Sequence, residues 1–474
     1  MPESTNDEAK AANRGILLLE SLAIFHGVAS HDTVAAYKSL LAEIAKIEAV
    51  PEAILIAYHR FCALALSRGW PECLLDLILE DDNIFSRQAA SRGITGVDPY
   101  VRGLAGRDLA ILQEVAGLTP AIVKDWVVRR VGGDDAVGLW GGHEGINARS
   151  AAVGDGDPVL PRNWPEWSAA FPGWLVAGTW LEQQRAQVKN CLVSSGRWSS
   201  AIDCLAAFYA RAGYGMFARY LAFHWEGGRQ AGSLRGIDAP DLMCLDQLIG
   251  LQREHQIIRE NTEHFLAGQP ASNIILYGNR GTGKSSTVKA LLTEYAHRGL
   301  RLVEMRKTDL TEFPALTLTL RVLPLKFIVF VDDLSFDERE PEYKALKTVL
   351  EGGLEPRPAN VLIYATSNRR HLLKESFMDR QAQGEEVHSR DSIEEQLSLA
   401  DRFGITVTFS TPDQEKYLKI VEGLAAQRGL CLERKDLQQQ ALKWEMWHNG
   451  RSGRTARQFI DYLTARVAMG KEEN

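Results

Sequence analysis

The pattern of apolar and polar residues changes character about half-way along the chain. Before residue 235, apolar residues recur at helical spacing, as in Val34–Ile47 and Ala53–Leu66. Thr119 and Pro120 fit the N-cap and first position of another helix. Helical spacing is seen again from about Trp174 to Trp225. The pattern therefore predicts an all-helical N-terminal region over residues 1–235.

A glycine- and proline-rich stretch interrupts this region at about residues 131–165 and predicts a linker or a long surface loop. Six tryptophans lie close together between residues 164 and 225: Trp164, Trp167, Trp174, Trp180, Trp198 and Trp225. They could stack on single-stranded nucleic acid, but no lysine or arginine is interleaved with the first four of them. We therefore favour the interpretation that these rings fill space between helices.

From about residue 240, short apolar runs alternate with helical patterns, which is typical of buried strands in a parallel α/β sheet. The runs are Asn273–Tyr277, Leu302–Met305, Phe327–Val331, Val361–Ala365 and Ile405–Phe409. The pattern predicts an α/β domain over residues 236–410.

After Ser410 the strand pattern stops and a helical pattern takes its place. Thr411 and Pro412 have the characters of an N-cap and a first helical position. Two more helices are expected near Asp436–Trp447 and Arg454–Met469. The sequence therefore predicts a small helical domain over residues 411–474.

One loop has the spacing G-x-x-x-x-G-K-[ST], directly after an apolar run and before a helical pattern. It consists of Gly278, Asn279, Arg280, Gly281, Thr282, Gly283, Lys284, Ser285 and Ser286. Its glycines let backbone N–H groups turn toward phosphates, and the following helix N-terminus adds partial positive charge. Lys284 is expected to reach the β- and γ-phosphates, and the Ser285 hydroxyl to bind Mg²⁺. The loop predicts a site for ATP and Mg²⁺ rather than a glycine-rich turn without a ligand.

Polar residues follow two of the later apolar runs. Asp332 and Asp333 end one run, and Asn368 follows another. Strand ends meet at the edge of an open α/β sheet where ligands bind. Asp332 is a candidate Mg²⁺ ligand and Asp333 a candidate base for the attacking water. The alternative for this pair is a helix N-cap with an acid in the first turn. Asn368 can orient the water or contact the γ-phosphate.

These elements, in this order, resemble the AAA+ ATPases, with Walker A, Walker B and sensor-1 motifs. Leu248–Gly250 resembles the segment that contacts adenine in that superfamily, so Ile249 and Gly250 are implied nucleotide contacts. Taken together, the motifs closely resemble the bacterial family called domain of unknown function 815, over about residues 200–470. They read LYGNRGTGKSS, VDDLSFD, LIYATSNRRHLL, LSLADRFG and RSGRTARQFI.

The resemblance also implies roles for two arginines. Arg402, in an Ala-Asp-Arg-Phe-Gly setting, matches the arginine finger, with Arg369 and Arg370 as weaker alternatives. Arg454 matches sensor 2, and Arg457 competes with it for that role. A surface salt bridge is the alternative explanation for each arginine. A finger acts on a neighbouring subunit's nucleotide, which implies a homo-oligomer that could be a hexameric ring.

One departure from the superfamily concerns the second Walker B acid. Most AAA+ ATPases have Asp-Glu there, whereas this chain has Asp332 and Asp333. Aspartate is one methylene shorter, so hydrolysis is expected but could be slow. The resemblance implies an ATP-hydrolysing AAA+ ATPase that remodels an unknown protein or nucleic-acid partner. The alternative is a slow ATP-gated switch, similar to a loader or an initiator.

Composition narrows these expectations. The chain has 474 residues, 54 Lys and Arg against 61 Asp and Glu, and a net charge of −7, so bulk charge does not favour nucleic acid. No apolar stretch is long enough for a membrane span, and the N-terminus lacks a signal-peptide pattern. The six cysteines show no zinc spacing. We therefore expect a cytoplasmic protein with reduced thiols. Residues 381–395 are polar and acidic and predict a mobile loop.

Overall fold

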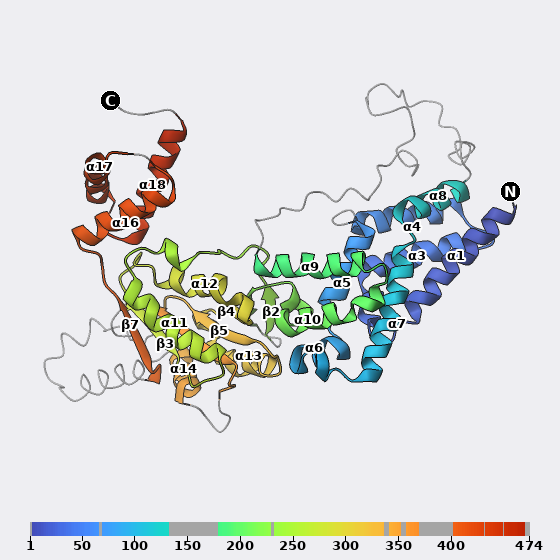
Figure 1. The fold of residues 1–474 in the computed structure, drawn as a ribbon, viewed down its shortest axis with the longest axis horizontal. Coiled ribbons are helices and arrows are strands. Elements are labelled where there is room, and N and C mark those ends of the chain that lie inside the picture. The colour runs from blue at the N-terminus through green and yellow to red at the C-terminus, as the bar shows by residue number, and fades with distance from the viewer. Residues whose placement is uncertain are drawn as a thin grey trace. The chain divides into compact units, whose positions relative to one another are not determined.

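The computed structural model describes residues 2–65, 69–131, 179–228, 232–335, 341–351, 357–368, 402–430, 432–448 and 450–469 (Figure 1). Several predictions lie outside these residues. They concern the glycine- and proline-rich stretch after residue 131, Trp164, Trp167, Trp174, Arg369, Arg370 and the acidic segment 381–395.

The described chain divides into two compact units, residues 1–219 and 220–474. The expected boundary at residues 235 and 236 is corrected, because residues 222–226 and 233–236 form strands rather than helices. In the first of these strands, the burial of Phe223 and Trp225 alternates with the exposure of His224 and Glu226. This period of two is a strand signal that the surrounding aromatic residues obscured.

The first unit is helical, as predicted. Its helices are α1 (Pro2–Glu20), α2 (His26–Ser30), α3 (Asp32–Ala45), α4 (Pro51–Ala65), α5 (Trp70–Glu80), α6 (Ile84–Arg92), α7 (Pro99–Ala116), α8 (Pro120–Val131), α9 (Trp180–Ser194) and α10 (Ile202–Ala212). Short 3₁₀ helices cover Ile94–Gly96, Trp198–Ala201 and Gly215–Ala218. In its core, the ring of Tyr37 lies 4.1 Å from that of Trp70 and 5.0 Å from that of Phe61, all three fully buried. Trp198 is also buried, as expected of a space-filling ring.

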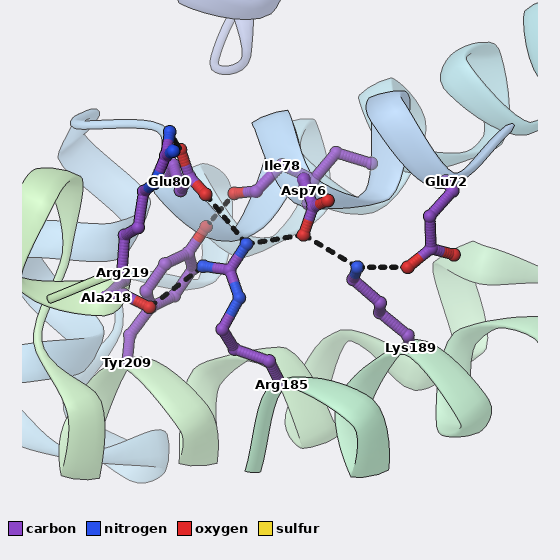
Figure 2. Close-up of polar contacts among 9 residues, drawn as sticks. All are labelled: Glu72, Asp76, Ile78, Glu80, Arg185, Lys189, Tyr209, Ala218 and Arg219. Carbon is purple, nitrogen blue, oxygen red and sulfur yellow. Dashed lines mark hydrogen bonds and ion pairs between the residues drawn. The ribbon is translucent and has the colours of Figure 1, made fainter. Parts of the chain in front are cut away.

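A network of charged side chains joins α5 to α9 within this unit (Figure 2). Arg185 of α9 contacts Asp76 and lies 2.7 Å from Glu80, and it donates a 2.9 Å hydrogen bond to the Ala218 carbonyl. Lys189, one turn further along α9, lies 2.6 Å from Asp76. The Arg185 side chain is only 12% exposed, so its carboxylate partners compensate a charge that is largely removed from water.

The second unit is built on a seven-stranded sheet in the order β2-β1-β4-β5-β6-β3-β7. The strands are β1 (Ala222–Glu226), β2 (Ser233–Gly236), β3 (Ile274–Gly278), β4 (Leu300–Glu304), β5 (Lys326–Val331), β6 (Val361–Ser367) and β7 (Ile405–Phe409). All five predicted strands are present, and only the β1–β2 pair is antiparallel among the pairings described. The predicted fold class, a helical region followed by a parallel α/β domain with a P-loop, is confirmed.

The helices of the sheet domain are α11 (Gln252–Leu266), α12 (Lys284–Tyr295), α13 (Phe313–Leu320) and α14 (Pro341–Glu351). Short 3₁₀ helices cover Leu245–Gln247, Ala296–Arg298 and Lys307–Glu312. Register places the ends of neighbouring strands together, since Tyr277 of β3 pairs with Ser367 of β6 and Gly278 pairs with Phe409 of β7. Residues that follow these strands are therefore gathered at one edge.

Three further helices form what we call the lid: α16 (Gln414–Gln427), α17 (Arg434–Trp447) and α18 (Gly453–Ala468). Tyr417, Val421 and Phe459 are among the buried residues of its own apolar core. The first lid helix begins two residues later than the sequence predicted. Asp413, not Thr411, is its N-cap, and the carboxylate accepts a 2.8 Å hydrogen bond from the Lys416 N–H. Among the described residues, no helix has the length and hydrophobicity that crossing a membrane would require.

Candidate nucleotide site

A cavity of about 480 Å³ lies at the carboxyl ends of the parallel strands, between the sheet and the lid. Its volume is in the range of sites that hold small molecules. The predicted site residues that line it are Ile249, Arg280, Gly281, Thr282, Gly283, Lys284, Ser285, Ser286, Asp332, Asp333, Asn368 and Arg454. One cavity therefore contains residues from all the motifs except the Arg402 motif.

The backbone of the P-loop requires glycine where the loop leaves β3. Gly278 has φ +152°, and a Cβ atom there would lie 2.1 Å from the Phe409 carbonyl oxygen of β7. Gly283 has φ +102° and is the N-cap of α12, so the chain turns directly into the helix. Lys284 and Ser285, the first residues of that helix, line the cavity.

Lys284 is held by the loop that it follows. Its ammonium donates hydrogen bonds of 2.7 Å and 2.9 Å to the carbonyls of Gly278 and Asn279, and one of 3.0 Å to Asn368 Oδ1. The residue is only 6% exposed. Burial lowers the pKa of Lys284 below that of an ordinary lysine, although Asp332 and Asp333 act in the opposite direction. The site therefore contains a partly desolvated cation whose direct partners are neutral oxygens.

Ser285 and Asp332 come together across the sheet edge, as the motifs predicted. The Ser285 hydroxyl donates a 2.7 Å hydrogen bond to Asp332 Oδ1. Thr366, at the end of β6, donates to the same carboxylate oxygen. The pair presents the hard oxygen ligands that Mg²⁺ prefers.

Asp333 adopts the left-handed region with φ +53°, where non-glycine residues are uncommon. Two hydrogen bonds support it: its N–H donates to Thr366 Oγ1 at 2.9 Å, and its carboxylate accepts from Asn368 Nδ2. Arg280 lies 3.8 Å from the other carboxylate oxygen. The two residues after Asp333 are not helical, so neither aspartate is a helix N-cap. The backbone turn directs the carboxylate of Asp333 into the cavity.

Residues of the lid form the wall of the cavity opposite the sheet. Arg454 N–H donates a 3.2 Å hydrogen bond to the Gly281 carbonyl of the P-loop. Arg457, one turn further along α18, also lines the cavity, and its guanidinium lies 3.9 Å from Met243 Sδ. The structure thus brings both sensor-2 candidates to the site.

The segment before α11 also packs on the lid. A Cβ atom at Gly423 of α16 would lie 2.3 Å from Ile249 Cδ1, so the helix backbone and this isoleucine are in close contact. Gln427 donates a 2.9 Å hydrogen bond to the Asp246 carbonyl. Ile249 therefore joins the wall of the cavity to the first lid helix.

Four predicted site residues do not line the cavity: Gly250, Gly278, Asn279 and Arg402. The carbonyls of Gly278 and Asn279 nevertheless hold Lys284. Arg402 lies just before β7, whose first residue pairs with the first residue of β3. It is therefore at the amino ends of these strands, about 17 Å or more from the P-loop at their carboxyl ends.

Comparison with known proteins assigns the chain to a family. The profile of the family described as "Protein of unknown function (DUF815)" matches residues 218–467, more than half of the chain. The chain belongs to the DUF815 family. No sequence match was found among curated proteins.

Solved structures are similar to this DUF815 member in their fold. The RuvB Holliday junction branch migration motor of Thermotoga maritima is 14% identical over 49% of this chain and 67% of that chain, with a TM-score of 0.34. The ORC2 protein of Aeropyrum pernix, in ADPNP and ADP complexes, is 16% identical over 49% of this chain and 66% of that chain, with a TM-score of 0.35.

Sequence reasoning missed several residues that line the DUF815 cavity. Thr366 stands in the motif LIYATSNRRHLL, in which only Asn368 was predicted to have a role. Lys416, Ile420 and Leu424 follow one another at intervals of four on α16 and form the lid wall of the cavity. That spacing places them on one helical face and was a usable signal. Lys416 adds a further cation to a cavity that already contains Arg280, Lys284, Arg454 and Arg457.

Proposed function

We propose that this DUF815 protein binds ATP with Mg²⁺ in the cavity and hydrolyses it to ADP and phosphate. The observation that carries the proposal is the convergence of five cationic side chains, the Ser285–Asp332 pair and the Asp333–Asn368 pair on one cavity. Cations outnumber the two aspartates, which suits a polyphosphate better than a neutral ligand.

Each side chain then has a role. Lys284 would exchange neutral oxygens for the β- and γ-phosphates, and Arg454 would contact the nucleotide from the lid. Ser285 and Asp332 fit Mg²⁺ by their donor atoms, and the ion would neutralise phosphate charge. The apolar wall, formed by Ile249, Ile420 and Leu424, would contact the adenine ring of ATP.

Hydrolysis needs a base near the γ-phosphate. Asp333 would accept a proton from a water molecule while the water oxygen forms a bond to the γ-phosphorus. The bond between the γ-phosphorus and the oxygen that bridges to the β-phosphate would break, which releases ADP. Asn368, hydrogen-bonded to Asp333, would orient that carboxylate and the water. A slow ATP-gated switch is the second candidate function, and the short Asp333 side chain is the observation that favours it.

We further propose that Arg402 acts on the nucleotide of a neighbouring copy in a homo-oligomer, which could be a hexameric ring. Its position at the far edge of the sheet prevents contact with the nucleotide of its own chain. Nucleotide-driven movement of the lid would then act on a protein or nucleic-acid partner.

Hydrolysis is tested by measuring the rate of phosphate release and the amount of nucleotide that stays bound to the protein. With Mg²⁺ and ATP, Asp333→Asn should retain bound ATP. It should release phosphate at least about 100-fold more slowly than the unmodified protein, since a positioned base contributes at least that factor. Asp241→Asn is the matched control, because it removes the same charge from a residue that does not line the cavity. Phosphate release by Asp333→Asn at the rate of the unmodified protein would refute the assigned base.

The role of Arg402 is tested by the hydrolysis rate per subunit at increasing protein concentration. The rate should rise with concentration, and Arg402→Ala should abolish the rise. Arg253→Ala, on the exposed face of α11, is the matched control. A rate that is independent of concentration and unchanged in Arg402→Ala would exclude a finger acting between subunits.

A further inference from the structure

A second hollow, of about 680 Å³, lies at the opposite edge of the sheet from the nucleotide cavity. Lys326 begins β5 there, whereas Asp332 follows the carboxyl end of the same strand. The six residues of β5 separate the two ends by about 20 Å. The hollow is therefore a site distinct from the nucleotide cavity, and nothing in the proposed function uses it.

The walls of this hollow combine apolar surface with positive charge. Leu318, which is 47% exposed, supplies most of the apolar surface, and the buried Phe313 and Leu323 also line the hollow. Arg321, Lys326 and Arg357 supply three cations, while no aspartate or glutamate is among the lining residues that the structure describes.

The partners of these cations are neutral. Lys326 Nζ donates a 3.2 Å hydrogen bond to the Ala359 carbonyl and lies 4.9 Å from the centre of the Phe265 ring. Burial lowers the pKa of Lys326, and no carboxylate in the described part of the chain opposes this effect.

Arg357 is also half-buried, and its guanidinium donates to the side chain of Asn273 and, at 3.3 Å, to the Ala271 carbonyl. Burial lowers its pKa as well. Arg321 is exposed, and its backbone N–H donates a 2.9 Å hydrogen bond to the Thr317 carbonyl, whereas its guanidinium forms no hydrogen bond or ion pair within the described residues. Cations that are removed from water are normally compensated by an acid. Here the compensating charge is missing from the described residues.

We propose that this hollow binds a small organic acid, in which an anionic group is attached to an apolar body. The anion would lie near Lys326 and Arg321, and the apolar body would lie against Leu318. The volume falls in the range typical of small-molecule sites, which favours a free acid over a flat protein interface. Binding there is independent of ATP hydrolysis.

Octanoate is a suitable probe, because it combines a carboxylate with an apolar chain. Calorimetric titration of the full-length protein, with MgADP present to occupy the nucleotide cavity, should show octanoate binding. Acetate lacks the apolar chain and octanamide lacks the charge, so each should bind at least about tenfold more weakly than octanoate. Equal binding of octanamide would overturn the anion requirement, and equal binding of acetate would overturn the apolar one.

Variants locate the site. Lys326→Gln and Arg321→Gln should each weaken octanoate binding by about tenfold or more, and Lys326→Arg should restore much of it. Lys344→Gln is the matched control, because this exposed lysine of α14 does not line the hollow. Arg321 is exposed and unpaired in the described structure, so its variant remains informative if Lys326→Gln fails to fold. No octanoate binding, or unchanged binding in Arg321→Gln, would overturn the proposal.

Discussion

Replacement of Lys284 by methionine tests how much the Lys284 ammonium contributes to ATP binding. Methionine has a similar length but no charge, so the change removes the ammonium and leaves the apolar stem. In the free protein this ammonium donates three hydrogen bonds of 2.7–3.0 Å, all to neutral oxygens. It is thus a desolvated cation that a phosphate would compensate.

The size of the effect follows from these contacts. A hydrogen bond that involves a charged group is worth about 1.5–3 kcal/mol, with the lower end for one charged partner and the upper end for two of opposite charge. Exchange of two bonds from the Lys284 ammonium to carbonyls for two bonds to phosphate oxygens would therefore contribute about 3 kcal/mol to binding. Since about 1.4 kcal/mol corresponds to a factor of ten, Lys284→Met should weaken ATP binding roughly 150-fold.

A fluorescent ATP analogue, titrated with Mg²⁺, measures this change. Lys289→Met is the matched control, since Lys289 lies on the same helix, pairs with Asp241 at 3.6 Å and does not line the cavity. The thermal midpoint of Lys284→Met should change little, because removal of a charge that burial disfavours offsets the loss of its three hydrogen bonds. Affinity within about threefold of that of the unmodified protein would refute the assignment of Lys284 to phosphate binding.

The same side chain predicts a dependence on pH. Burial lowers the pKa of Lys284 below 10.5, the ordinary value for lysine, so the free protein loses this proton at a lower pH than an ordinary lysine does. Phosphates bind the protonated form. ATP affinity should therefore fall as the pH rises from about 7 toward about 10, more steeply than in Lys284→Met. Equal slopes in the two proteins would contradict this explanation.

Three other predictions concern stability. Gly278→Ala would place a Cβ atom 2.1 Å from the Phe409 carbonyl oxygen, so urea unfolding should show a loss of more than about 1 kcal/mol. Arg185→Leu leaves Asp76 without its arginine partner in a largely buried network, and calorimetry should show a loss of about 3 kcal/mol in the first unit. Burial lowers the pKa of His255 to about 4, so unfolding free energy should fall as pH drops from about 6.5 toward 4, and His255→Gln should flatten that slope.

The sequence was sufficient to predict the half of the site that the sheet positions. Asp332 and Asn368 each stand directly after a buried apolar strand, and Lys284 follows another such strand at the end of the P-loop. Parallel strands end at a common edge, so identification of the strands also predicted that these side chains would meet. Their hydrogen bonds in the structure confirm the proximity, though not the roles.

The rest of the fold depended on information that local patterns do not contain. The strand of Phe223 and Trp225 is only five residues long and follows a long helical region, so its period of two was lost among aromatic residues. The cap of the first lid helix was assigned to Thr411 because Pro412 follows it. Asp413 is the N-cap instead, while the Thr411 hydroxyl accepts a 2.7 Å hydrogen bond from Asn279 of the P-loop. A tertiary contact therefore gave Thr411 a different role.

The contact between P-loop and lid also limits how the nucleotide cavity can change. Arg454 is bound through its backbone to Gly281, and Ile249 packs against Gly423 of the lid. Three of the five cations that line the cavity, Lys416, Arg454 and Arg457, come from lid helices, whereas both aspartates come from the sheet. Movement of the lid away from the sheet would therefore remove most of the positive charge and leave the aspartates with Lys284 and Arg280. Since phosphates need those cations, the charge distribution by itself links nucleotide affinity to the position of the lid.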